Sequence, residues 1–317
     1  MKTRIRVPDR KPDRTHAGIP RRQWLWSNLM KRLAATIRRR PLVGFFVIAY
    51  GLSWAVWVPM ALAGARVYKG QPWPSHVPGM FGPIAAGLIM SAAVAGTLGI
   101  RQLVRRMFQW RVAKRWYLVA LSPLGFYGVA AVIGVAFGQG LPNLSQLGSF
   151  SGLPLVAAPL MWLLLLVTAF AEETGWRGFA VNEMLKKRSL LFTAVIIGLL
   201  WAMWHVPSMF MIESYRQMGL AILPILTLGI VSGSILLAWL YRESGGSVLI
   251  VAIWHASYNL VTGTAAAHGL VAAVVSTGVM AWASWIVAAE LRKGRRARRS
   301  TSGLEIHPAL VLQTEGH

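Results

Sequence analysis

Long apolar runs, separated by short polar segments, dominate the chain between residues 41 and 291. A transmembrane α-helix needs about 20 predominantly apolar residues to cross the hydrocarbon core of a bilayer, and several of the runs have this length. Few charged residues interrupt them. The pattern therefore predicts an all-α fold, a polytopic membrane helical bundle with about eight transmembrane helices.

The expected spans follow the individual runs. They cover residues 41–64, 79–99, 116–138, 153 through the acidic motif at 171–177, 190–212, 220–241, 247–263 and 267–291. On the sixth span, Gly229 and Gly233 stand four residues apart, a spacing of small residues that lets a second membrane helix approach closely.

Basic residues cluster at the two ends and in alternate loops. The ends are a basic N-terminal arm, 1–40, and a basic C-terminal tail, 292–317, on either side of the bundle at 41–291. The loop at 101–115 is rich in Lys and Arg, whereas the loop at 139–152 has neither. Because positively charged loops tend to stay in the cytoplasm, both termini are expected to be cytoplasmic.

The charge balance is strongly basic, with 33 Lys and Arg against 10 Asp and Glu and a formal net charge of +23. Such an excess often marks nucleic-acid binding. Here the basic segments lack interleaved aromatic residues on which bases could stack, so no nucleic-acid partner is expected and membrane lipid is. The chain has no cysteine, which excludes disulfides, thiolate nucleophiles and Cys-ligated zinc.

Two adjacent acids stand out in the fourth span. Residues 153–170 carry no charge, and Glu172, Glu173 and Arg177 follow them. Glu173 and Arg177 are spaced i, i+4, so they share a helix face and can pair. Glu172 points about 100° away and has no local partner. Acids inside membrane helices are costly and usually functional, and an unpaired one suits proton transfer.

Two later spans carry the histidines that are expected inside the membrane. The fifth places Trp201 and His205 on one face, and the seventh places His255 and Asn259 on one face. Counting residues from the turn between the fourth and fifth spans puts Glu172 and His205 at similar depth. His255 and Asn259 lie midway along their span, so all four groups could meet in one water-accessible cavity.

Each of these groups has a structural explanation when taken alone. A Glu–Arg pair can hold helices together, and a membrane His or Asn is often an interhelical hydrogen bond. Their joint occurrence on three helices at matching depth favours a functional site. The set suits peptide-bond hydrolysis, in which Glu172 activates water, His205 orients it, and His255 and Asn259 hold the oxyanion.

The same residues resemble three motifs of the CPBP family of intramembrane proteases, which contains the type II CAAX prenyl proteases and the bacteriocin-processing, immunity-type Abi proteins. The Glu-Glu-x-x-x-Arg motif stands here at 172–177, the Phe-x-x-x-His motif at 201–205 and the His-x-x-x-Asn motif at 255–259. The resemblance covers a candidate protease core at 153–263. Trp201 stands where the family usually has Phe, so a changed pocket shape rather than lost chemistry is expected.

The resemblance implies the same roles for Glu172, His205, His255 and Asn259, with Glu173 and Arg177 in support. Members are often labelled metalloproteases, and a divalent metal such as zinc, if present, would be held by Glu172, His205 and His255. A metal-free water activated by glutamate fits these residues at least as well and is the preferred interpretation. No other cofactor is expected.

The expected function is an intramembrane endopeptidase. It would cut near a membrane-anchored or lipidated tail of a peptide or membrane-protein substrate, presented from the cytoplasmic side. One alternative is a non-proteolytic scaffold or bacteriocin-immunity-type protein using the same polar cavity, and another is a transporter with Glu172 as proton carrier. The Ala-, Gly-, Arg- and Trp-rich composition is typical of a high-GC bacterium, so a bacterial cytoplasmic membrane is the expected location.

Overall fold

The computed structural model describes residues 38–304, with side chains to residue 296. Most of the predicted N-terminal arm, 1–40, and the end of the C-terminal tail lie outside the described residues. Between residues 38 and 304 the chain forms helices joined by loops, and its only β-type pairings are isolated bridges. The all-α prediction is confirmed.

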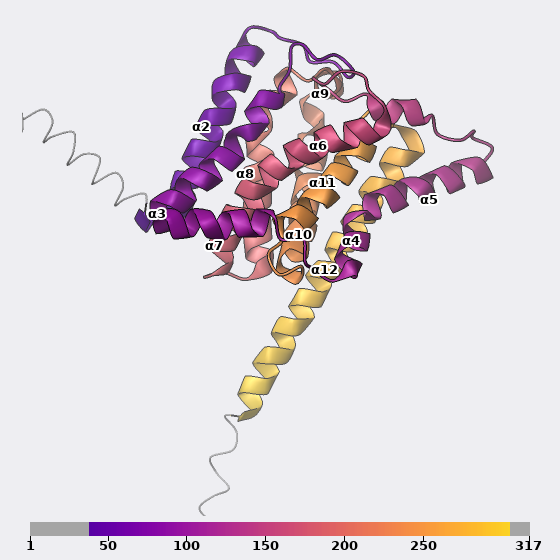
Figure 1. Cartoon of the computed structure of the whole chain (residues 1–317). Coiled ribbons are helices and arrows are strands. Elements are labelled where there is room, and N and C mark those ends of the chain that lie inside the picture. Colours follow the sequence, from indigo (N-terminus) through magenta and orange to yellow (C-terminus); the bar gives the residue numbers. More distant parts are fainter. Residues whose placement is uncertain (1–37, 305–317) are drawn as a thin grey trace, which may run out of the picture. The chain divides into compact units, whose positions relative to one another are not determined.

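The helices follow the predicted apolar runs. Their bounds are α2 Pro41–Leu62, α3 Gly82–Met107, α4 Lys114–Ala120, α5 Ser122–Ala136, α6 Ala158–Glu173, α7 Asn182–Leu185, α8 Leu190–Trp204, α9 Glu213–Met218, α10 Leu223–Glu243, α11 Val248–Thr262 and α12 Gly269–Leu304. Short 3-10 turns occur at η2 Val77–Phe81, η3 Leu144–Gly148, η5 Val206–Phe210 and η6 Leu220–Ile222, and a π-helix at η4 Thr174–Val181. In Figure 1, α6 and α11 lie side by side, with α2 and α3 on one side of them and α4 and α5 on the other.

Each predicted span corresponds to a helix, but not all of these helices are long enough to cross a bilayer alone. Within the described residues, 6 helices pass by length and composition, and up to 7 if α4 and α5, bent by 51°, form one span. The remaining helix, α11, has 15 residues and a length of about 22 Å at 1.5 Å per residue, against a hydrocarbon core of about 30 Å. The predicted count of about eight is therefore not confirmed by this criterion.

Helix α3 is longer than the predicted second span because it continues past a kink. Ala95 and Gly96 leave the helical conformation, and Gly96 has a φ of 58°, which glycine adopts without steric cost. Past the kink, Gly99 lies so close to the Ser91 carbonyl that a Cβ there would be 2.2 Å from the oxygen. The kink thus separates the apolar half of α3 from its basic end at Arg105 and Arg106.

The closest backbone contacts between helices involve glycines other than the predicted pair. No atom of the described residues lies within 4 Å of a Cβ placed at Gly229 or Gly233, so these two do not mediate a close approach within the described bundle. Instead, a Cβ on Gly198 of α8 would be 3.0 Å from the Val231 Cα of α10. Gly175 of η4 is tighter still, because a Cβ there would be 2.3 Å from the Pro83 carbonyl oxygen of α3.

Four loops join at one end of the bundle and form what we call the loop layer, residues 63–76, 148–153, 206–213 and 263–267. Isolated bridges pair Val67 with Ile212, Lys69 with Ser151, and Phe150 with Thr264. Backbone hydrogen bonds reinforce them, such as Val67 N–H to Met211 O at 2.8 Å and Ala265 N–H to Ser149 O at 3.0 Å. The loop layer fixes the ends of α2, α8 and α11 relative to the start of α6.

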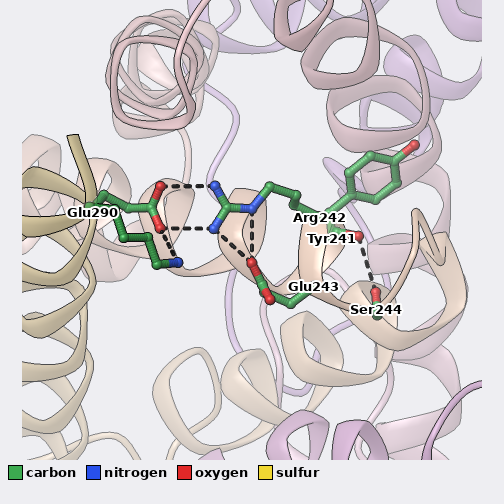
Figure 2. Close-up of polar contacts among 6 residues, drawn as sticks. Tyr241, Arg242, Glu243, Ser244 and Glu290 are labelled. Atoms are coloured by element: carbon green, nitrogen blue, oxygen red, sulfur yellow. Dashed lines mark hydrogen bonds and ion pairs between the residues drawn. The ribbon is translucent and has the colours of Figure 1, made fainter. Parts of the chain in front are cut away.

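At the opposite end, an ion cluster joins α10 to α12. Arg242 donates two hydrogen bonds to Glu290, each of 2.9 Å, and also binds Glu243 (Figure 2). Lys293 donates to the same Glu290 carboxylate at 2.9 Å. The planar guanidinium matches the carboxylate in a two-bond arrangement, which orients both helices.

We predict that Gly175→Ala destabilises the fold by about 1–3 kcal/mol, the usual cost of overpacking, because the new Cβ would overlap the Pro83 backbone. The measurement is thermal unfolding of the detergent-purified protein. Gly229→Ala is the matched control, since it meets open space and alanine is the better helix former. Equal melting temperatures for the two variants would contradict the prediction.

Candidate active site

The two acids lie at the end of α6 and are fully buried. Glu172 is 1% exposed and Glu173 0% exposed. Charged groups this deep in a membrane protein require partners, because the surrounding lipid and apolar side chains provide no hydration. The partners of the two carboxylates come from different helices, which gives each acid a distinct environment.

Glu173 is the centre of a buried ion cluster. Arg177 Nη1 donates to Glu173 Oε1 at 2.9 Å, which confirms the pairing predicted from their i, i+4 spacing. His255 Nδ1 lies 2.8 Å from the same oxygen. Because a carboxylate oxygen accepts, the proton on Nδ1 is donated to Glu173, and this leaves Nε2 of His255 as the nitrogen that can act on a substrate.

Arg177 completes the cluster from the η4 segment. Its side chain is 0% exposed, and its Cζ lies 4.5 Å from the ring centre of Trp201. A cation over an indole face is stabilised by the negative potential of the ring. Among the described residues, Arg177 Nε and Nη2 have no hydrogen-bond partner, so Glu173 and the Trp201 ring carry most of its compensation.

Glu172 accepts a hydrogen bond from another helix. The indole Nε1–H of Trp201 on α8 donates to Glu172 Oε2 at 3.1 Å. From the sequence, Glu172 was expected to have no partner on its own helix. Trp201 was expected only to change the shape of the pocket. The structure adds a donor that phenylalanine, the usual residue at this position of the motif, could not supply.

His205 follows α8 directly and faces the same region. Its Nδ1 lies 2.8 Å from the Trp201 carbonyl oxygen, so Nδ1 donates and Nε2 is left as an acceptor. Its ring stands edge-on to Trp204, with centroids 4.8 Å apart. His205 is partly exposed, unlike the two acids.

Helix α11 contributes His255 and Asn259, one turn apart. His255 is 5% exposed and its ring stands edge-on to Trp201, with centroids 5.4 Å apart. Asn259 is partly exposed, and its side-chain amide has no hydrogen-bond partner within the described part of the chain. Direct contacts therefore bring six of the seven predicted site residues together, and Asn259 follows His255 on the same face.

The π-helix η4 was not expected from the sequence. It begins at Thr174, immediately after the acids, and all eight of its residues are buried. π-Helical turns are rare and are frequently found at functional sites. Gly175 and Gly178 are the features of the sequence that could have indicated it, because glycines let the wide turns pack closely against α3 and α11. A Cβ on Gly178 would contact Leu103 of α3 and Val248 of α11.

Two neighbours of the site also escaped the sequence analysis. His76, in the loop layer, is 5% exposed, and burial lowers its pKa to about 4, with the nearby His205 adding to the effect. Its carbonyl accepts from Trp57 Nε1 at 2.7 Å, and the Trp57 ring lies 4.5 Å from the Trp204 ring, tilted by 56°. Tyr215 of α9 has a pKa raised by burial first and then by the nearby Tyr258 and Glu172.

The residues do not form a ready metal centre. In the described residues, no group of three His, Asp or Glu side chains is arranged to hold a metal ion. His255 Nδ1 is directed to Glu173 and His205 Nδ1 to a backbone carbonyl, which leaves Nε2 of each ring free. The set Glu172, His205 and His255 does not fit a three-ligand metal site in this arrangement.

In a comparison with known proteins, the same segment matches a protein family. Residues 154–261, which contain the complete candidate site, match the family described as type II CAAX prenyl endopeptidase Rce1-like. The CAAX prenyl protease 2 of Methanococcus maripaludis is 25% identical over 232 residues, which cover 68% of this chain and 82% of that protein. Over this segment the chain is similar to the Rce1-like family.

The similarity to Rce1-like proteases, together with the apolar helices, supports a membrane-embedded protease. The resemblance inferred from the three motifs is confirmed. The roles of individual residues, the expected cytoplasmic termini and the bacterial membrane stay predictions.

We predict that Arg177→Met destabilises the protein by about 3–5 kcal/mol, because it leaves a buried carboxylate without its ion-pair partner. Unfolding in a detergent titration measures the change. Lys186→Met is the control, since Lys186 pairs with Glu183 at an exposed position where such pairs contribute about 0–1 kcal/mol.

The double variant Glu173→Gln/Arg177→Met should be more stable than Arg177→Met alone, because it removes the orphaned charge. An Arg177→Met protein as stable as the Lys186→Met protein would show that the pair does not hold this region together.

Proposed function

We propose that this membrane protease cleaves a peptide bond by glutamate-activated water, with Glu172 as the base. The proposal depends on one observation, which is that the two buried acids have different hydrogen-bond partners. Glu173 is bonded to Arg177 and His255, whereas the one hydrogen-bond donor to the Glu172 carboxylate among the described residues is the indole N–H of Trp201, which leaves oxygen lone pairs for a water molecule. A scaffold would have no reason to keep a second buried carboxylate so sparsely bonded.

The chemistry follows from these contacts. Glu172 takes a proton from water while His205 Nε2 accepts a hydrogen bond from the other O–H and orients the lone pair. The oxygen attacks the carbonyl carbon of the substrate, and the carbonyl electrons move to the oxygen. When the tetrahedral intermediate collapses, the C–N bond breaks and Glu172 returns the proton to the departing amine.

In this mechanism, His255 and Asn259 hold the oxyanion. The Asn259 amide is a donor, and His255 can donate from Nε2 while Nδ1 stays bonded to Glu173. Both ring nitrogens then carry protons, and the adjacent Glu173 carboxylate balances the imidazolium charge. Donors placed in advance at an oxyanion contribute a large share of the catalysis of amide hydrolysis.

The substrate class follows from the relative. A CAAX prenyl protease acts, as its name says, on prenylated tails, and by analogy we propose a membrane-anchored or lipidated peptide segment for this chain. The water attack needs no metal, and the missing three-ligand set among the described residues supports a metal-free reaction.

We predict that Glu172→Gln lowers cleavage by about 10²–10⁴-fold, the usual contribution of a general base. The amide oxygen of glutamine can still accept the Trp201 N–H, so the variant should keep its fold and melting temperature. Comparing new protein termini in membranes of cells with wild-type or variant protein measures the loss. Glu183→Gln, near the exposed Lys186, is the control and should retain cleavage.

Cleavage by purified protein should persist after treatment with a strong chelator and dialysis. A carboxylate base with histidine and asparagine donors requires no cation. Peptide hydrolysis followed by mass spectrometry, with metal content measured on the same sample, gives the answer. Activity that disappears on chelation and returns with zinc would refute the metal-free mechanism.

A further inference from the structure

The indole of Trp201 lies between the helices that supply the candidate active site. Trp201 is 6% exposed, and its ring stands edge-on to His255 of α11, with centroids 5.4 Å apart. The Cζ atom of Arg177, from η4, lies 4.5 Å from the ring centre, and the indole N–H reaches Glu172 of α6. The Trp201 carbonyl accepts from His205 Nδ1 at 2.8 Å. This one residue of α8 therefore contacts α6, η4 and α11 at the site.

The contact with Glu172 differs from the ring contacts because it depends on a single N–H group. An indole N–H donates and cannot accept, so its favourable partner is an oxygen lone pair. A hydrogen bond of this kind is stronger when the acceptor is ionised than when it is neutral. The donor holds Oε2 of Glu172 at 3.1 Å, which leaves Oε1 for the water molecule of the proposed mechanism.

Three other buried tryptophans do not make such a bond. Trp176 of η4, Trp204 of α8 and Trp254 of α11 are each at most 1% exposed. Their Nε1 atoms have no hydrogen-bond partner among the described residues. A buried indole in this bundle can therefore be held by packing alone, and the bond from Trp201 to the acid is not a general requirement of its surroundings.

A phenylalanine at position 201, the usual residue of the motif, would keep an aromatic ring and lose the donor. The ring could still pack against Arg177 and His255, because both contacts involve its face or edge and not a polar atom. Within the described part of the chain, no second donor to the Glu172 carboxylate is present. Without the indole N–H, this carboxylate would turn about its side-chain bonds with no hydrogen bond to oppose it.

We propose that Trp201 is a positioning residue for Glu172. Its indole N–H holds one oxygen of the carboxylate and so aims the other oxygen at the water that attacks the substrate. Trp201 acts through Glu172 and does not itself take part in proton transfer. This inference rests on the proposed proteolytic function and adds to it a residue whose N–H, and not only its shape, serves the reaction.

The variant Trp201→benzothienylalanine, made by incorporation at an amber codon, tests the N–H separately from the ring. In this analogue sulfur replaces the N–H, while the size and the faces of the bicyclic ring are kept. The probe is a peptide that spans a Glu172-dependent cleavage site found in membranes. With purified protein, kcat should fall about 10–100-fold, as expected when a hydrogen bond to a charged group and the alignment it provides are lost. KM and the melting temperature should stay close to the wild-type values.

Trp254→benzothienylalanine is the matched control, because the Trp254 N–H has no partner among the described residues. This variant should keep the wild-type kcat. A purely structural role for Trp201 would leave kcat unchanged in its analogue too, since the packing of the ring is preserved. Wild-type kcat for the analogue at position 201, or an equal loss at position 254, overturns the inference.

The dependence on Glu172 is tested by combining the variants. In the Glu172→Gln protein, the analogue at position 201 should cause little further loss of the residual kcat, because the base through which Trp201 acts is already gone. An undiminished loss in that background would overturn the inference while leaving the proteolytic function intact. If no cleavage by the wild-type protein depends on Glu172, the proposed function itself fails.

Discussion

The buried contact of Glu173 with Arg177 and His255 is the interaction on which the rest of the site depends. Charges inside a membrane protein persist only when they are compensated, and here one carboxylate serves two donors. It joins the end of α6 to η4 and to α11, and Arg177 extends the contact to Trp201 on α8. With these helices held together, the neighbouring Glu172 has a fixed direction as well as a fixed depth.

Much of this architecture was predictable because its determinants are local. Apolar runs of helical length gave the membrane helices, and i, i+4 spacing gave the Glu173–Arg177 pair. Depth counted from the turn before Ser189 brought Glu172 and His205 together. What local pattern does not contain is the rotation of one helix against another, which side-chain packing decides. For that reason His255 was expected at the oxyanion or, with a metal present, as its ligand, and its bond to Glu173 was not foreseen.

Backbone departures from regular helix were missed for a related reason. The wide turns of η4 depend on how closely Gly175 approaches Pro83 on α3, a contact between segments far apart in the sequence. The same holds for Gly198, which mediates the close packing of α8 on α10 that was expected from Gly229 and Gly233. Trp201 is a different case. The sequence shows that this residue has an indole N–H donor, but it does not show that Glu172 is the acceptor.

The π-helix also affects how this stretch can be aligned with other chains. A π-helix places more residues in each turn than an α-helix, so positions beyond it are rotated relative to a straight helical extrapolation. Adding or removing one residue between 174 and 181 would turn Asn182 and the following segment about the axis while both acids kept their places. A one-residue gap here would therefore signify a change of helix type, and the carboxylates of Glu172 and Glu173 would stay in register across it.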